Sequence, residues 1–209
     1  MGWHQFLSFD SLKENRALLQ SYVQNYYIIS LAIFMAVYVC VVALSLPGAT
    51  ILSISAGFLF GTIAGTFFTV LAATAGACLI FLIAKTSFGE SLEKRAGHFL
   101  HKMRSGFQDN AFSYLLTLRL VPLFPFFIIN LVPALLGMRL RDYAVATFLG
   151  IIPGAFVYVS VGTGLGSVFE SGEAFNVKSI LTPEILVALL GLGCLSLLPV
   201  ILKFIKSRR

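Results

Sequence analysis

Charged residues are scarce in this chain of 209 residues: Asp, Glu, Lys and Arg make up 11% of it, against 58% for the hydrophobic residues. In soluble globular domains the charged share is about a quarter. Between Arg16 and Lys85 no residue carries a formal charge, and a run of that length holds more than one stretch of about 20 apolar residues, enough for one membrane crossing. The composition excludes a soluble domain and predicts an integral membrane protein.

Side chains that carry nucleophilic or metal chemistry are also few. The three cysteines lie in apolar runs without metal-ligand spacing, and the three histidines lie outside the apolar segments. The pair His98-x-x-His101 has no carboxylate ligand beside it. Nucleophilic and acid–base catalysis need such groups in a cluster, so we expect no enzyme activity, no metal site and no cofactor. No aromatic and basic groove for nucleic acid is present either.

Four apolar segments are long enough to cross a bilayer: residues 27–46, 62–84, 143–168 and 185–202. Two others are not suited to crossing. Residues 47–61 are too short, and residues 115–138 contain three prolines, each of which removes a helix hydrogen bond. We predict an all-α membrane protein with about four transmembrane helices, plus two re-entrant helical hairpins formed by these two segments.

The basic residues support this topology, because Lys and Arg beside spans accumulate on the cytoplasmic side. If both segments enter and leave by one face, then of the 15 basic residues only Lys178 falls on the opposite side, with Arg119 inside a hairpin. Both termini are then cytoplasmic. The chain divides into an N-terminal interfacial segment (1–26), a membrane domain (27–168), and an external loop with the last transmembrane helix and a basic tail (169–209).

The loop between the second span and residue 115 has a helical pattern. Ser87-x-x-Glu90 is a capping box, and apolar residues follow one helical stripe: Phe88, Leu92, Phe99, Met103 and Phe107. We expect an amphipathic helix on the cytoplasmic surface. The pattern fits a helix that binds lipid headgroups and equally a solvated loop helix.

Arg119 and Asn130 are the unusual residues of the second re-entrant segment. An arginine near the middle of a membrane costs about 2.5 to 3.5 kcal/mol even on a lenient insertion scale. Backbone groups freed by proline also need partners, so such a segment survives only inside protein or beside a water-filled cavity. Because a guanidinium binds phosphate well, the segment predicts a polar path that accepts a phosphate group.

The two broken segments resemble each other. Each begins near a proline, Pro47 in the first and Pro122 with Pro125 in the second, and each ends in a similar run that closes on glycine, 57–61 and 134–137. Entering from opposite faces, they predict an inverted repeat of the kind that places transporter sites at the midplane. Composition alone is the alternative explanation, since Pro and Gly are common in membrane helices.

Small residues on the second and third spans are spaced for close helix packing, among them Gly65, Gly76, Gly150, Gly154 and Gly162. Gly154 also follows Pro153, where a helix is able to kink. Such faces are compatible with a homo-oligomer.

Several motifs together resemble a known family. They are RLVPLFPFFIIN (119–130), GMRLRDY (137–143), GIIPG (150–154), PGA (47–49) and GFLFG (57–61). The sequence is similar to the VTT-domain (SNARE-associated) family of the DedA superfamily, in its Tvp-like branch, over about residues 46–166. The resemblance implies two re-entrant segments that meet in the membrane. It also implies lipid movement between leaflets, by phospholipid scramblases in eukaryotes and polyprenyl-phosphate flippases in bacteria.

The family motif is only partly present. Arg119 and Pro122 match its R-x-x-P, whereas Pro125 stands where the DedA branch has a second arginine, and Ala134 where glycine is usual. The first re-entrant segment has no Asp or Glu, so no carboxylate there is available to bind a proton. Downhill scrambling fits this sequence better than proton-coupled transport.

The sequence thus predicts a transporter of membrane lipids in the plasma (inner) membrane. Arg119, Asn130, Pro122 and Pro125 are expected to bind the lipid, and Arg139 and Arg141 to anchor headgroups on the cytoplasmic face. Six residues are expected to shape the hairpins: Pro47, Gly48, Gly57, Gly61, Pro133 and Gly137. A structural or assembly factor without transport activity is the alternative.

Overall fold

The computed structural model describes residues 16–85, 89–120 and 125–171, and within these ranges every regular element is a helix. The helices are α2 (Arg16–Asn25), α3 (Tyr27–Ala43), α4 (Ala49–Phe60), α5 (Thr62–Ala84), α6 (Gly89–Leu120), α7 (Phe126–Leu135) and α8 (Leu140–Ser171). The expected last transmembrane helix, the basic tail and Pro122 lie outside the described residues, as do both termini.

From α3 onward the helices form two units with the same order: a leading helix, a short apolar helix and a long helix. The units are α3–α4–α5 and α6–α7–α8. The short helices have 12 residues in α4 and 10 in α7, and the long ones have 23 in α5 and 32 in α8. After each short helix the chain turns at a glycine with positive φ, Gly61 (76°) and Gly137 (81°). Only glycine adopts such angles without strain, so the two equivalent turns need this residue.

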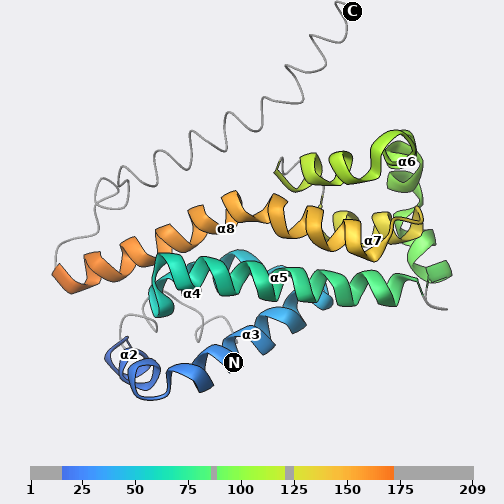
Figure 1. The fold of residues 1–209 in the computed structure, drawn as a ribbon. Helices are drawn as coiled ribbons and strands as arrows, with labels where there is room; N and C mark the ends of the chain where they lie inside the picture. Colours follow the sequence, from blue (N-terminus) through green and yellow to red (C-terminus); the bar gives the residue numbers. More distant parts are fainter. Residues whose placement is uncertain (1–15, 86–88, 121–124, 172–209) are drawn as a thin grey trace, which may run out of the picture.

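The two long helices lie side by side and run in opposite directions (Figure 1). The start of α5 meets the end of α8 through Thr62 Oγ1, which hydrogen-bonds Thr163 Oγ1 at 3.1 Å. The end of α5 meets the start of α8, where the Phe81 and Tyr143 rings are 4.4 Å apart. Each short helix packs on the long helix of the other unit, α4 on α8 and α7 on α5, while α3 packs on α5 and α6 on α8. This exchange between antiparallel units supports the predicted inverted repeat.

Helices α3 and α4 form an antiparallel hairpin, and here the structure differs from the sequence-based prediction. Tyr38 Oη lies 3.0 Å from Ser53 Oγ, and the Tyr27 ring at the start of α3 lies 5.8 Å from the Phe60 ring at the end of α4. The sequence predicts that residues 27–46 cross the membrane and that 47–61 re-enter alone. In the structure both form one hairpin, because packing brings the start of α3 back to the end of α4.

The turn of this hairpin, residues 44–48, lies part of the way along α5. A Cβ at Gly76 would lie 2.7 Å from the Val39 carbonyl oxygen of α3, so the end of α3 is level with Gly76. Helix α5 continues for eight more residues to Ala84, which is about 12 Å at 1.5 Å per residue. The hairpin therefore stops inside the bundle.

Helix α6 changes direction at Asn110, whose backbone is non-helical (φ −161°, ψ 89°). The Asn110 side chain accepts a hydrogen bond from the Ser113 backbone N–H at 3.0 Å, as a residue that caps a new helix does. The part before Asn110 is the expected amphipathic helix. Its apolar residues Met103 and Phe107 are buried in the core, so this part of the stripe packs against protein. The part after Asn110 packs on α7 and forms the second hairpin with it.

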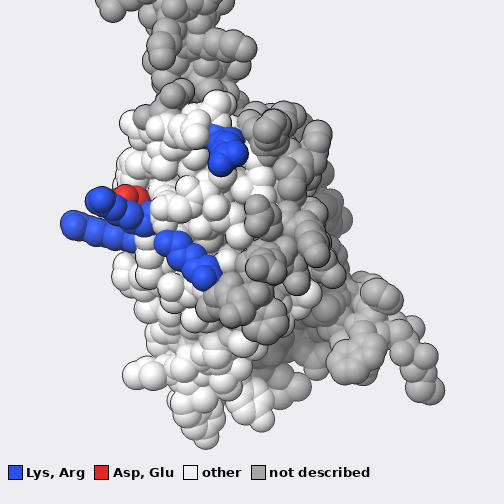
Figure 2. Space-filling view, turned by 90° about the vertical axis from the view of Figure 1, so that its right-hand side faces the viewer, with Lys and Arg blue, Asp and Glu red and all other residues white. Residues whose placement is uncertain are grey.

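Exposed hydrophobic side chains cover the outside of the bundle, as shown by Ile63 (87% exposed) and Ile28 (78%). Helix α5 and residues 140–165 of α8 are long and apolar enough to cross a membrane. Lys85 follows the end of α5, and Arg139 and Arg141 stand at the start of α8. Figure 2, which views this end of the bundle, shows blue Lys and Arg side chains among the white, uncharged residues of the described surface. Exposed hydrophobic side chains around the bundle, with basic residues at one end of it, are typical of the surface of a membrane protein.

Candidate functional site

The candidate site is centred on Arg119 in the last turn of α6. Its backbone lies very close to α8, because a Cβ added at Gly150 would lie 2.5 Å from the Arg119 Cβ. The glycine lets the two helices touch there. The Arg119 side chain is half-buried and points into the space between α7 and α8.

Three neutral side chains accept hydrogen bonds from the Arg119 guanidinium. One terminal nitrogen donates to Asn130 Oδ1 at 2.9 Å. The other donates to Tyr143 Oη at 2.9 Å and to Thr147 Oγ1 at 3.2 Å. Asn130, Tyr143 and Thr147 are buried. They fix the direction of the guanidinium without neutralising its charge.

The Tyr143 ring contacts groups from both units. The centroid of the Phe81 ring of α5 lies 4.4 Å from that of Tyr143, and the Arg119 Cζ lies 5.6 Å from the Tyr143 centroid. A cation within about 6 Å of an aromatic face is attracted by the ring. Both units thus contribute to holding the arginine.

Asn130 also links the two hairpins. Its side-chain nitrogen donates to Ser45 Oγ at 3.4 Å, and Ser45 lies in the turn between α3 and α4. Ser45 has a positive φ of 51°, the one such value among the described non-glycine residues, which marks a tight turn there. The turn of the first hairpin therefore meets the middle of α7 beside Arg119.

The charge of Arg119 is not compensated within the described part of the chain, since none of its contacts is a carboxylate. Its Nε is buried without a hydrogen-bond partner there. A guanidinium has five N–H donors in a fixed plane and suits the oxygens of carboxylate or phosphate. Arg119 thus keeps an uncompensated charge and an unpaired donor.

The other residues expected at the site have structural positions. Pro125 is the exposed residue before α7, and its carbonyl accepts from the Ile128 N–H at 3.0 Å. Pro133 lies inside α7, and its carbonyl accepts from the Met138 N–H at 3.0 Å in a turn that ends the helix at Gly137. Pro47 and Gly48 lie in the turn between α3 and α4.

Gly57 lies where α4 crosses α8. A Cβ there would overlap the Val159 carbonyl, and a Cβ at Gly162 would overlap that of Ile54. The two glycines are reciprocal and let the backbones touch; the spacing of small residues on the third span predicts this for Gly162. Arg139 and Arg141 are exposed at the basic end, away from Arg119.

Three residues of the site were not anticipated: Ser45, Tyr143 and Thr147. Hydroxyl-bearing side chains are ordinary at helix ends and on membrane helices, so none of them stands out alone. The spacing of Tyr143 and Thr147, four residues apart on one helix face, is the available signal.

Comparisons with known proteins agree with this fold. The family model of the VTT domain matches residues 46–164, more than half of the chain. The chain is 31% identical to the transmembrane protein 41 homolog of Dictyostelium discoideum over 94% of its length and 58% of that protein. It is 27% identical to mouse transmembrane protein 41B, over 92% of its length and 65% of that protein. The chain therefore spans about three fifths of these relatives.

A third relative is the transmembrane protein 41 homolog of Caenorhabditis elegans, 29% identical over 93% of this chain and 78% of that protein. No solved structure matches. The family model covers α4, α5 and α7, and α8 as far as residue 164. The chain belongs to the VTT-domain family of the DedA superfamily.

Proposed function

We propose that this protein moves phospholipids or polyprenyl-phosphate lipids between the leaflets of the plasma (inner) membrane. The observation that carries the proposal is Arg119: a guanidinium held inside the bundle by neutral partners, with an unpaired donor. Keeping such a charge in a membrane is costly. An anionic group that passes through the site offsets this cost, and lipid phosphates are the abundant anions of a bilayer.

The two hairpins give the path its position. They enter the bundle from opposite ends, and the Ser45–Asn130 contact joins the turn of one to the short helix of the other. In the membrane they are re-entrant, and the end with Lys85, Arg139 and Arg141 faces the cytoplasm. The start of α3 lies at the other end, beside Phe60, so the proposal places the start of α3 on the opposite face and differs there from the cytoplasmic N-terminal side that the sequence predicts.

Arg119 meets the lipid phosphate, while Asn130, Tyr143 and Thr147 keep the guanidinium in one orientation. No acidic residue occurs in α3, α4, α5 or α7, so the described core of the bundle has no carboxylate to carry a proton. Movement is therefore downhill and runs in both directions.

Reconstitution tests the proposal. Purified protein is placed in liposomes with fluorescent phospholipid, and a reductant that does not cross the bilayer bleaches the outer leaflet. We expect the inner-leaflet label to be bleached as well, at a rate that an imposed pH gradient does not change. Labelled polyprenyl phosphate is compared in parallel. Bleaching equal to that of protein-free liposomes for both lipid classes contradicts the proposal.

One observation favours a purely structural role as the second candidate. The Arg119 network ties α6, α7 and α8 together, and such a network is able to serve assembly alone. A folded protein that binds partners in the membrane but leaves lipid movement unchanged supports this candidate.

A further inference from the structure

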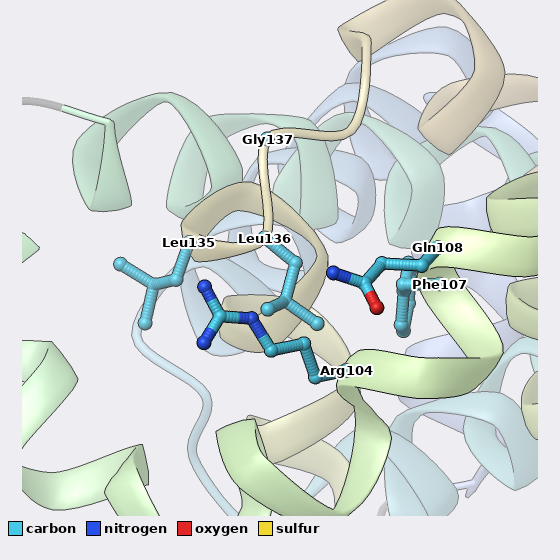
Figure 3. A pocket seen from close by; sticks show the side chains of 6 residues that line it. All are labelled: Arg104, Phe107, Gln108, Leu135, Leu136 and Gly137. Atoms are coloured by element: carbon cyan, nitrogen blue, oxygen red, sulfur yellow. The ribbon is translucent and has the colours of Figure 1, made fainter.

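A second polar site lies at the basic end of the bundle, apart from Arg119. It is a cavity of about 370 Å³ between α6 and the end of α7, lined by Arg104, Phe107, Gln108, Leu135, Leu136 and Gly137. Small-molecule sites are typically about 300–1,000 Å³. Figure 3 shows the Arg104 and Gln108 side chains extending from α6 toward Leu136.

The lining has two chemical halves. Phe107 is buried, and Leu135 and Leu136 are partly buried, so they form an apolar floor. Arg104 and Gln108 are exposed and form a polar rim. No hydrogen bond or ion pair joins the Arg104 guanidinium to another described residue. An amphipathic ligand with an anionic head fits this division.

The charges select among lipid headgroups. The six described lining residues include one cation and no carboxylate, so among them a phosphate finds a partner while the ammonium of choline or ethanolamine does not. Gln108 offers both a donor and an acceptor for hydroxyl groups. The cavity therefore favours a net-negative headgroup with hydroxyls, such as that of phosphatidylglycerol, over a zwitterionic one.

The position of the cavity connects it to the path. Its floor is the end of α7, and Asn130 lies five residues before Leu135, about 8 Å along the helix axis. The α7–α8 turn that borders it is fixed by Lys85 Nζ, which donates to the Met138 carbonyl at 3.0 Å. A lipid held there sits at the mouth of the second hairpin.

We propose that this cavity binds the headgroup of an anionic phospholipid from the leaflet at the basic end. Its role as the entry station of the lipid path rests on the proposed function, whereas binding itself does not. The Arg104 guanidinium contacts the phosphate, Gln108 contacts the headgroup hydroxyls, and the upper part of an acyl chain covers Leu135 and Leu136.

Photolabelling tests this site. Full-length protein is reconstituted in phosphatidylcholine vesicles with a small fraction of photoreactive phosphatidylglycerol, and labelled peptides are identified by mass spectrometry. We expect labels on peptides containing residues 104–108 and 135–137. In Arg104→Gln, labelling should fall by about tenfold, the scale of one lost charge-assisted hydrogen bond. Ser105→Ala, which changes an exposed residue of the same helix outside the cavity lining, is the control and should label normally.

A second variant tests the volume of the cavity separately from the charge of Arg104. Gln108→Trp fills the cavity from an exposed position while keeping Arg104, and it should also reduce labelling. Three outcomes overturn the proposal: equal labelling by photoreactive phosphatidylcholine, equal loss in Ser105→Ala, or competition by inorganic phosphate. The last would mark a free-phosphate site.

Lipid movement is measured in the same vesicles. Labelling of the cavity without lipid movement contradicts the proposed function and leaves the binding site standing. Lipid movement without labelling contradicts the binding site and leaves the proposed function standing.

Discussion

At the scale of single residues, the site depends on how a positive charge is kept inside an apolar bundle. Arg119 has hydrogen bonds to three neutral side chains rather than an ion pair. Membrane hydrogen bonds of this kind contribute about 0.6 kcal/mol each, which is less together than the cost of about 2.5 to 3.5 kcal/mol for the charge. The arginine is therefore not explained by stability, which points to function.

Asn130 gives the first prediction. It is fully buried and bonded to both Arg119 and Ser45. Asn130→Leu keeps the volume but leaves the guanidinium without one acceptor, so we expect a loss of about 1.5 to 3 kcal/mol in stability. Thermal unfolding in detergent measures it, with Ile129→Leu as the neighbouring buried control that should cost less. An Asn130→Leu protein as stable as wild type would mean that Asn130 does not support the guanidinium.

The sequence predicts part of this site and misses the rest for a physical reason. Arg119 and Asn130 stand out because polar groups are rare in apolar segments. Ser45 and Tyr143 do not, since their roles come from where packing places them. Arg119 and Ser45 are 74 positions apart in the chain and share Asn130 only because the hairpins meet.

At the scale of helices, glycines determine which elements touch. Gly57 and Gly162 face each other's neighbouring carbonyls where α4 crosses α8, so any side chain there pushes the helices apart. The spacing of Gly162 predicts close packing and the structure confirms it, whereas Gly154, of which the same is predicted, has no neighbour that a Cβ would meet within 4 Å. Helix α5 was also predicted with the observed bounds, 62–84, because Gly61 and Lys85 end the apolar run on both sides.

A pair of glycine variants on α8 tests this contact. Gly162→Ala places a methyl group against the Ile54 carbonyl, whereas a Cβ at Gly154 meets nothing within 4 Å. We expect Gly162→Ala to lower stability by about 1 to 3 kcal/mol. Gly154→Ala should be neutral or gain up to about 1 kcal/mol from helix propensity. Equal thermal stabilities for the two variants would contradict the close α4–α8 crossing.

The hairpin of α3 and α4 shows where prediction from helices fails. Residues 27–46 are apolar and long enough for a transmembrane helix. The length of an apolar segment does not show, however, which other helix it packs against. The Tyr27–Phe60 and Tyr38–Ser53 contacts decide this, and they are tertiary.

At the scale of the whole molecule, the two units pack into each other, because the short helix of each unit lies on the long helix of the other. The similar glycine-ending runs predict a repeat, and the equivalent turns at Gly61 and Gly137 support it. Because α5 and α8 run in opposite directions, the hairpins enter from opposite ends. Under the proposed function these hairpins are re-entrant, and the path that they form passes Arg119.

Topology follows from this arrangement and is testable. Tyr26 is exposed next to the start of α3, and Arg139 is exposed at the basic end. In a background with Cys40, Cys78 and Cys194 replaced by serine, we expect Tyr26→Cys and Arg139→Cys to react with an impermeant maleimide from opposite faces of the membrane. Labelling from the same face would contradict the hairpin and would mean that residues 27–46 cross the membrane, as the sequence predicts.

The most direct test of the account is the rate of lipid movement in proteoliposomes containing Arg119→Gln. Ser113→Ala, which changes an exposed polar side chain of the same helix outside the site, serves as the control, and both proteins are reconstituted in equal amounts. We expect movement of anionic lipid to slow at least about tenfold in Arg119→Gln and to stay at the wild-type rate in Ser113→Ala. Equal rates in all three proteins would show that lipid does not pass the buried guanidinium.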